Sequence, residues 1–281
     1  MIFRILFAAL LLCFGTTQAG VLARLEFSGK VGGTIDLELF EADKPLTVAN
    51  FVAYVNSGAW HDCLLDRWEP GFVIQAGSRH LTHNPDLLSP IQTTSFTPVT
   101  PFPKVPFEKN VGRQFSNLFG TIAMARSGTN ATPEELNSAQ TDWFFNLSDN
   151  LFLDSSAGGY TVFGRTLRGT NVLNTFKTGT TNLYHYPQTT VPLYSEDGRN
   201  AFWIHIDISL LTAQIARVAG GNEISWDSVE GLPNTVEFTR TIPAVWEEAQ
   251  TVAGTGARLS ITNDPGGDAF RQYRVRIQYP E

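Results

Sequence analysis

The chain contains the run Leu65-Asp66-Arg67-Trp68-Glu69-Pro70-Gly71-Phe72-Val73-Ile74-Gln75-Ala76-Gly77, in which one arginine precedes an apolar segment that ends in a glutamine. Side chains of a β-strand alternate between its two faces. The run therefore predicts a strand in which Phe72 and Ile74 share one face, while Val73 and Gln75 share the other. Arg67 would lie at the mouth of this apolar segment.

Two further stretches extend the pattern. A glycine begins the run Gly120-Thr121-Ile122-Ala123-Met124-Ala125-Arg126-Ser127, and an aromatic run follows at Asp142-Trp143-Phe144-Phe145. A cation beside a slot with apolar and aromatic walls, and with a few amide donors, suits a small apolar ring attached to a peptide backbone. Proline in a peptide is such a ligand.

At these residues the chain resembles the cyclophilins, the cyclosporin-binding class of peptidyl-prolyl cis/trans isomerases, and in particular the exported bacterial type. The family's core block, roughly F-H-R-x-x-P-G-F-M-I-Q-x-G, is similar to residues 65–77, and the G-T-x-x-M-A-R of bacterial members to residues 120–126. The S-Q-F-F-I-N run stands altered at 141–146. The L-D and V-F-G of a fourth motif stand at 153–154 and 162–164, with a short insertion between them.

The resemblance covers about residues 20–211 and implies a mainly β fold, a closed antiparallel eight-stranded barrel capped by two helices. Local patterns agree with this fold. Apolar and polar residues alternate over 34–40 and 202–210, as in strands with one buried face. Residues 48–55 carry an apolar stripe at helical spacing, for which we expect Thr47 to be the N-cap. Residues 79–107 and 177–200 predict loops.

The pattern changes after Leu211. Short strand-like runs at 215–218, 223–226, 236–239, 258–262 and 272–279 predict a separate small β-rich module over residues 212–281. The runs around Trp226 and Tyr273 resemble a fibronectin-type-III-like sandwich of exported bacterial proteins, although about 70 residues is short for a full sandwich. The alternative is a β-rich extension packed on the barrel.

Residues 1–19 predict a signal peptide. Arg4 precedes the apolar run Ile5–Phe14, and Thr17-Gln18-Ala19 offers small residues for cleavage before Gly20. The apolar run is too short to span a bilayer, although an uncleaved anchor is the alternative. We therefore expect an exported protein, periplasmic or extracellular, with no membrane attachment after cleavage. Cleavage leaves Cys63 alone, so no intramolecular disulfide can form.

Charge and motifs exclude several other classes of function. A net charge of -7 lacks the basic footprint of a nucleic-acid binder. Nucleophile-elbow, zinc-protease, Walker and dinucleotide-binding motifs are absent from the sequence. His80 and His83 have no acidic or cysteine partner at ligand spacing. We therefore expect neither a metal nor a cofactor.

Arg67 is the predicted electrostatic catalyst. A guanidinium can donate to the lone pair of the prolyl nitrogen, which is available only when the amide is twisted, so the interaction is made in the transition state alone. Gln75 would hydrogen-bond the substrate backbone and steady Arg67. The alternative for Arg67 is a structural salt bridge to Asp66, Glu69 or Asp142.

The resemblance assigns the remaining slot residues. Ala125 and Arg126 would line the groove for the residues before proline, although Arg126 could equally be a solvated cation. Phe152 stands where animal members often carry the tryptophan that contacts cyclosporin, so cyclosporin binding should be weak at most. Tyr160 stands where many members carry a pocket histidine. The proline pocket itself would be formed by Phe72, Val73, Phe144 and Leu153.

The chain departs from the family pattern at three places, one of which is Trp143 in place of a phenylalanine. Leu65-Asp66 replaces the usual Phe-His before the arginine, and Asp142 replaces a glutamine that contacts the substrate backbone. A carboxylate at 142 could pair with Arg67 and compete with substrate. Two functions follow: a prolyl isomerase that assists the folding of exported proteins and binds proline-containing peptides and unfolded chains, or a non-catalytic proline-peptide-binding module whose C-terminal unit attaches to a partner or surface.

Overall fold

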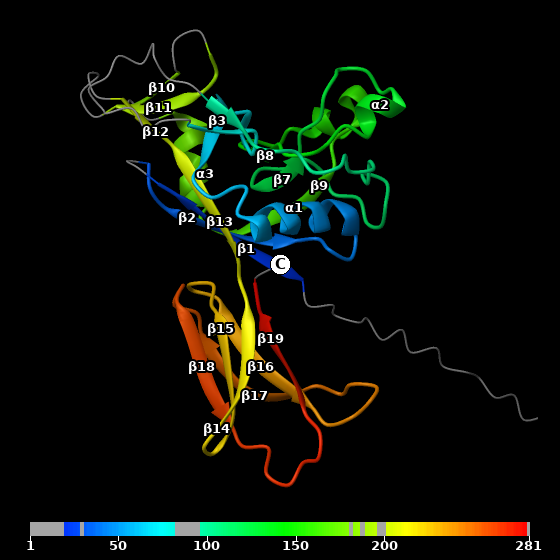
Figure 1. The fold of residues 1–281 in the computed structure, drawn as a ribbon, viewed down its shortest axis with the longest axis vertical. Helices are drawn as coiled ribbons and strands as arrows, with labels where there is room; N and C mark the ends of the chain where they lie inside the picture. Colours follow the sequence, from blue (N-terminus) through cyan, green and yellow to red (C-terminus); the bar gives the residue numbers. More distant parts are fainter. Residues whose placement is uncertain are drawn as a thin grey trace, which may run out of the picture.

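The computed structural model of the protein describes residues 20–28, 31–81, 96–179, 182–185, 189–195 and 201–279. The predicted signal peptide, residues 1–19, lies outside the described residues, and so does the stretch 82–95 of the expected loop 79–107. Figure 1 shows a barrel with helices around it and, below it, a separate group of strands formed by the C-terminal part of the chain.

Eight antiparallel strands close into a barrel, as the sequence predicted. Their order around the barrel is β1-β13-β3-β4-β8-β7-β9-β2. The strands are β1 (Val21–Phe27), β2 (Thr34–Leu39), β3 (Cys63–Glu69), β4 (Val73–Ala76), β7 (Thr121–Met124), β8 (Trp143–Asn146), β9 (Val162–Arg168) and β13 (His205–Leu210). Closure leaves no free edge within the barrel, so every strand has two partners.

Alternate side chains of each barrel strand point into the barrel. On β8, Trp143 and Phe145 are fully buried in the main core, whereas Phe144 between them belongs to a second cluster outside the barrel wall. On β4, Ile74 faces the main core and Val73 the second cluster. The period-two alternation of strands thus divides one run of apolar sequence between a structural interior and an outer surface.

Two helices complete the main core, as expected. Apolar residues of α1 (Pro45–Ser57) and α3 (Thr170–Thr178) belong to the same buried cluster as the barrel interior. The predicted N-cap was wrong, because α1 begins at Pro45 and Thr47 is inside it. The distant carboxylate of Glu108 caps this helix instead, accepting from the backbone N–H groups of Leu46 (3.1 Å) and Thr47 (2.7 Å). Three short helices lie between β7 and β9: α2 (Pro133–Leu136), η2 (Leu151–Asp154) and η3 (Ser156–Gly158).

Residues 177–200 are not the simple loop that the sequence suggested. They contain the end of α3 and two strands, β10 (Leu183–His185) and β11 (Pro192–Ser195), which form a small sheet with β12 (Ala201–Trp203). The single strand expected over 202–210 is accordingly divided into β12 and β13. This sheet and the hairpin β5 (Arg79–Leu81) and β6 (Phe96–Pro98) pack on the barrel wall through a cluster formed by Leu64, Leu81, Phe96, Val191, Leu193 and Trp203.

The C-terminal module is a sandwich of two three-stranded sheets, β14-β15-β18 and β17-β16-β19. Trp226 joins the sheets, since its indole N–H donates to the side chain of Asn234 across the sandwich at 3.0 Å. The sequence missed β17, because polar and exposed residues dominate that strand. The strands are β14 (Ala213–Val218), β15 (Gly221–Asp227), β16 (Pro233–Thr239), β17 (Glu247–Ala253), β18 (Arg258–Asn263) and β19 (Gln272–Ile277).

Arg24 of β1 holds the module against the barrel. Its guanidinium donates to the buried carboxylate of Asp36 at 2.7 Å and to the backbone carbonyl of Ser228 in the module at 2.9 Å. A second link joins the hydroxyl of Tyr279 to Glu38 of β2. The C-terminal unit therefore has a core of its own and is also packed on the barrel.

Candidate active site

One row of side chains crosses five neighbouring strands on the outside of the barrel. Arg67 on β3 is opposite Gln75 on β4, and Gln75 is opposite Phe144 on β8. Phe144 is opposite Ala123 on β7, which is opposite Val162 on β9. Directly opposed residues have Cβ atoms about 5 Å apart. The sheet register alone thus brings the predicted catalytic arginine and the predicted pocket phenylalanine to one surface.

The outer cluster beside this row is apolar and largely aromatic. Its buried members are Val73, Ala123, Phe144, Leu153 and Val162, and Phe40, Phe72, Phe115, Ala125 and Tyr160 pack against them. The four residues predicted to form the proline pocket therefore lie together. Sequence reasoning missed Phe40 and Phe115, whose rings stack at 4.0 Å. The alternation expected over 34–40 could have revealed Phe40, because this residue follows the inward-facing Leu39.

Phe72 corrects the simple strand interpretation. It was expected on the face of Ile74, but β4 begins only at Val73, and Phe72 lies in the preceding turn. Its ring therefore packs against the outer cluster. There it stacks on Phe152 at 5.6 Å and lies 5.9 Å from the guanidinium carbon of Arg67. Periodicity failed at this residue because alternation applies only within the strand.

Arg67 is only loosely held. Its side chain is 40% exposed, and it makes an ion pair with Glu69 at 3.7 Å. A partly exposed pair of this length contributes little to stability. Of the three salt bridges considered from the sequence, the one to Glu69 is present, whereas the described residues show none from Arg67 to Asp66 or Asp142. The guanidinium is therefore available to a ligand.

Asp142 is engaged by other groups. Its carboxylate accepts a hydrogen bond from the side-chain amide of Gln75 at 3.1 Å and one from the hydroxyl of Thr141 at 2.6 Å. Gln75 is the residue between Arg67 and Phe144 in the cross-strand row. Asp142, the acid that departs from the family pattern, thus holds the side-chain amide of Gln75 and makes no ion pair with Arg67 among the described residues.

A β-bulge places a buried acid next to Arg67. Leu65 is opposite Ala76 and Arg67 is opposite Gln75, so Asp66 is an extra residue in β3. Its buried carboxylate accepts from the backbone N–H of Ser78 at 3.3 Å and from the Ser78 hydroxyl. Burial raises the pKa of Asp66 to about 6. The sequence located this acid but gave no sign of the bulge.

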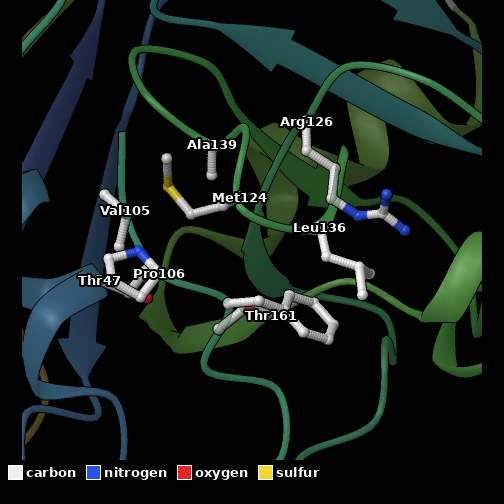
Figure 2. A pocket seen from close by; sticks show the side chains of 9 residues that line it. Thr47, Val105, Pro106, Met124, Arg126, Leu136, Ala139 and Thr161 are labelled. Carbon is white, nitrogen blue, oxygen red and sulfur yellow. The ribbon is translucent and has the colours of Figure 1, made fainter. Parts of the chain in front are cut away.

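Arg126 is not the solvated cation that the sequence allowed. Its guanidinium donates to the backbone carbonyls of Gly159 (3.0 Å) and Ala157, and it lies 4.7 Å from the ring centre of Tyr160. Tyr160 in turn meets Phe144 edge to face at 5.7 Å. Figure 2 shows the stem of Arg126 beside a small, mainly apolar pocket, with its guanidinium turned away from Met124.

Within the described ranges, His, Cys, Asp and Glu side chains form no group of three or more that could hold a metal ion. The same ranges contain no helix long and apolar enough to cross a bilayer.

The sequence profile of the family described as "Cyclophilin type peptidyl-prolyl cis-trans isomerase/CLD" matches residues 23–195. The chain belongs to this cyclophilin-type family. The matched region contains all eleven predicted site residues, from Arg67 to Tyr160, and ends before the C-terminal module.

The chain is similar in sequence to two named relatives. Peptidyl-prolyl cis-trans isomerase A of Dickeya dadantii is 34% identical over 142 residues, which span 50% of this chain and 64% of that protein. A peptidyl-prolyl cis-trans isomerase of Streptomyces antibioticus is 34% identical over 155 residues, 52% of this chain and 78% of that protein. A solved cyclophilin-type isomerase of Cryptosporidium parvum covers 68% of this chain and 98% of its own, with 18% identity and a TM-score of 0.43.

Proposed function

We propose that the protein is a peptidyl-prolyl cis/trans isomerase that acts on proline-containing segments of exported proteins while they fold. The observation that carries this proposal is the cross-strand row in which Arg67, Gln75 and Phe144 are successive neighbours beside an apolar aromatic cluster. The row offers an apolar seat for a proline ring and, next to it, a cation that is not committed to a tight salt bridge.

The reaction needs no covalent intermediate. Amide resonance sets the barrier to rotation about the X–Pro bond at about 20 kcal/mol. With the ring held by Phe144 and Val73, the guanidinium of Arg67 donates to the prolyl nitrogen as its lone pair is released by twisting. That hydrogen bond exists only in the transition state. Lowering the barrier by about 5 kcal/mol accelerates the rotation more than a thousandfold.

Gln75 and Asp142 position the peptide in this proposal. The Gln75 amide N–H is held by Asp142, which orients the Gln75 side chain between the arginine and the pocket. Its carbonyl oxygen then faces the substrate backbone and Arg67. Ala125 and Arg126 line the groove for residues that precede proline. The exposed Phe152 takes the place of a cyclosporin-contacting tryptophan, so cyclosporin would bind weakly.

The proposed setting is outside the cytoplasm, in the periplasm or beyond it. The pattern of residues 1–19 supports export, and Cys63 is compatible with an oxidising compartment. This cysteine is buried, and burial raises the pKa of its thiol to about 12, which keeps it unreactive. The C-terminal module is proposed to be a fibronectin-type-III-like sandwich. The partners are proline-containing peptides and unfolded proteins.

A second function is favoured by the acids near Arg67. Glu69 pairs with the guanidinium, and Asp142 accepts a hydrogen bond from Gln75, which is the cross-strand neighbour of Arg67. If substrate could not displace Glu69, the slot would bind proline peptides without turning them over. The protein would then be a binding module that the C-terminal unit attaches to a partner or surface.

Exchange spectroscopy on a proline peptide separates the two functions, because it measures isomerisation and binding in one sample. We expect the protein to be active, and Arg67→Ala to lose about a hundredfold or more in kcat/KM while peptide affinity changes by only a few fold. Arg67→Lys keeps the positive charge but removes the planar, forked donor, so it should recover little of the activity that Arg67→Ala loses. Arg217→Ala, on the exposed strand β14, is the matched control. Equal rates for the parent and Arg67→Ala, with binding intact, would establish the binding module instead.

A further inference from the structure

The hydrogen bonds of the Arg126 side chain, within the described residues, all go to one loop. Its guanidinium donates to the backbone carbonyl of Gly159, from Nε at 3.2 Å and from Nη2 at 3.0 Å, and also to the carbonyl of Ala157. The guanidinium carbon lies 4.7 Å from the ring centre of Tyr160 and 5.9 Å from that of Phe107. The head of Arg126 is therefore committed to this loop and to two rings.

The loop that receives these hydrogen bonds, residues 153–160, is closed at its base. The backbone N–H of Tyr160 donates to the backbone carbonyl of Leu153 at 3.1 Å. Leu153 is buried in the outer cluster of the candidate site, and Tyr160 packs against the same cluster. The two ends of one loop therefore supply two walls of the proposed proline slot. Whatever fixes the loop also fixes these walls.

The tip of the loop has a backbone conformation that needs support from outside. Ala157, Gly158 and Gly159 all have positive φ, at 52°, 86° and 94°. For an alanine this left-handed conformation is uncommon and unfavourable. Such a conformation persists only where the surrounding structure holds it. Arg126 binds the carbonyls of two of these three residues, so its hydrogen bonds are part of that support.

The ring of Tyr160 connects Arg126 to the slot. It meets the ring of Phe144, the residue predicted to seat the proline, edge to face at 5.7 Å. The same ring is in contact with the guanidinium of Arg126. Edge-to-face ring pairs and cation–π contacts are both directional. Together they define where the Tyr160 ring lies beside the buried Phe144.

We propose that Arg126 is a positioning residue for prolyl isomerisation, which acts through Tyr160 and holds the 153–160 loop as a wall of the proline slot. The proposal rests on the proposed function, because it takes the slot to be the seat of the proline ring. It replaces direct contact between the Arg126 guanidinium and substrate with an indirect effect. Removal of Arg126 should weaken peptide binding more than it slows rotation, because the proposed donor Arg67 stays in place.

A double-mutant cycle between Arg126 and Tyr160 tests the proposal in the full chain. The dissociation constant of a capped Ala-Ala-Pro-Ala peptide is measured by NMR titration for the parent, Arg126→Met, Tyr160→Ala and the double variant. We expect each single variant to bind about tenfold more weakly, and the double variant also about tenfold, because both changes remove the same wall. Exchange spectroscopy should show KM raised by a similar factor and kcat within about threefold of the parent.

Two further variants separate positioning from a general loss of charge or of fold. Arg126→Lys keeps a donor for the loop carbonyls without the planar fork, and should recover part of the affinity that Arg126→Met loses. If Arg126→Met does not fold, the cycle is run with Arg126→Lys. Arg113→Met removes an exposed arginine that lies 5.1 Å from the ring centre of Phe115 in the same cluster, and should change the dissociation constant by less than about twofold. Without peptide, the nuclear Overhauser contact between the Tyr160 and Phe144 rings should weaken in Arg126→Met and persist in Arg113→Met.

Several results would overturn the proposal. Multiplicative effects, about a hundredfold in the double variant, would show that Arg126 meets the substrate itself. Unchanged peptide affinity or an unchanged ring contact in folded Arg126→Met would limit Arg126 to stabilising the loop, and an equal loss in Arg113→Met would show a general effect of charge. The proposed function fails separately, if the parent and Arg67→Ala isomerise the peptide at equal rates. The contact between the Tyr160 and Phe144 rings then still decides whether Arg126 positions the wall.

Discussion

Asp142 accepts a hydrogen bond from the side-chain amide of Gln75 at 3.1 Å. This contact determines how the unusual acid affects the slot. A carboxylate bound by Gln75 and by the Thr141 hydroxyl has both oxygens engaged, and the described structure shows no ion pair between it and Arg67. The acid that stands where the resemblance places a glutamine therefore accepts a hydrogen bond from Gln75 and does not neutralise Arg67.

The first prediction concerns Asp142→Asn. The amide oxygen of asparagine can still accept from Gln75, so kcat/KM for a proline peptide should stay within about threefold of the parent. The measurement is exchange spectroscopy at low ionic strength, where charge effects are largest. A rise of tenfold or more would mean that Asp142 competes with substrate for Arg67.

The second prediction concerns pH and Asp66. Burial raises the pKa of this carboxyl from 3.8 to about 6 in the folded state. The folded protein therefore holds the proton more tightly than the unfolded chain, and Asp66 makes folding less favourable as pH rises from about 4 to about 6. Asp66→Asn lacks this titration. As pH rises from about 4 to about 6, the free energy of unfolding of Asp66→Asn should therefore increase by roughly 2 to 3 kcal/mol relative to that of the parent.

Urea unfolding of both proteins at several pH values between 4 and 7 measures this difference, because other titrations are common to both proteins and cancel. Asp264→Asn, in an exposed turn, serves as the control, and its free energy of unfolding should change with pH as that of the parent does. If Asp66→Asn also runs parallel to the parent, the carboxyl is not strained by burial, and the account of the bulge is wrong.

The barrel could be predicted because its signals are local and repeated. Alternation assigned Ile74 to the interior and Val73 to the outer surface, and the resemblance supplied the closure. The same rule misplaced Phe72, because a turn before β4 has no alternation. It also missed the Asp66 bulge, since an inserted residue looks like any other residue in a sequence. The alternation rule failed at β17 for another reason, because no residue of this strand is buried.

The candidate site was recoverable only in part. The resemblance named Arg67, Gln75 and Phe144, and the strand register brings them into one row. Their catalytic roles remain predictions. Phe115 was not found, because it reaches the slot from an irregular segment that is positioned by long-range contacts. One such contact is its stacking on Phe40. No local periodicity records a contact between segments about 75 residues apart in the chain.

The third prediction concerns the junction between the barrel and the module. Arg24 is the main partner of the fully buried Asp36, whose other cation, Arg168, is 4.0 Å away. Arg24→Met would leave a buried carboxylate largely uncompensated and free the carbonyl of Ser228, at a cost of roughly 3 kcal/mol in the free energy of unfolding. Denaturant unfolding measures this loss. Arg217→Met, at an exposed position, should change it by less than about 0.5 kcal/mol, and similar values for the two variants would show that the junction is not held by Arg24.

The last prediction concerns Lys44, whose buried ammonium supports the segment that leads to Phe115. It donates to the backbone carbonyls of Glu108, Lys109, Val111 and Arg113, so the chain at 108–113 wraps around one charge. Lys44→Met leaves these carbonyls without their donor and should cost at least about 3 kcal/mol of unfolding free energy. Hydrogen exchange at 108–115 should accelerate well before global unfolding.

The same substitution should also affect the slot. Phe115 packs on the outer cluster through Phe40, so loosening 108–115 should raise KM for proline peptides more than it lowers kcat. Lys104→Met removes an exposed lysine from the preceding segment and should alter neither stability nor KM. If Lys44→Met destabilises the protein but leaves KM at the parent value, the Lys44 cage supports the barrel alone, and Phe115 does not depend on it for its place in the slot.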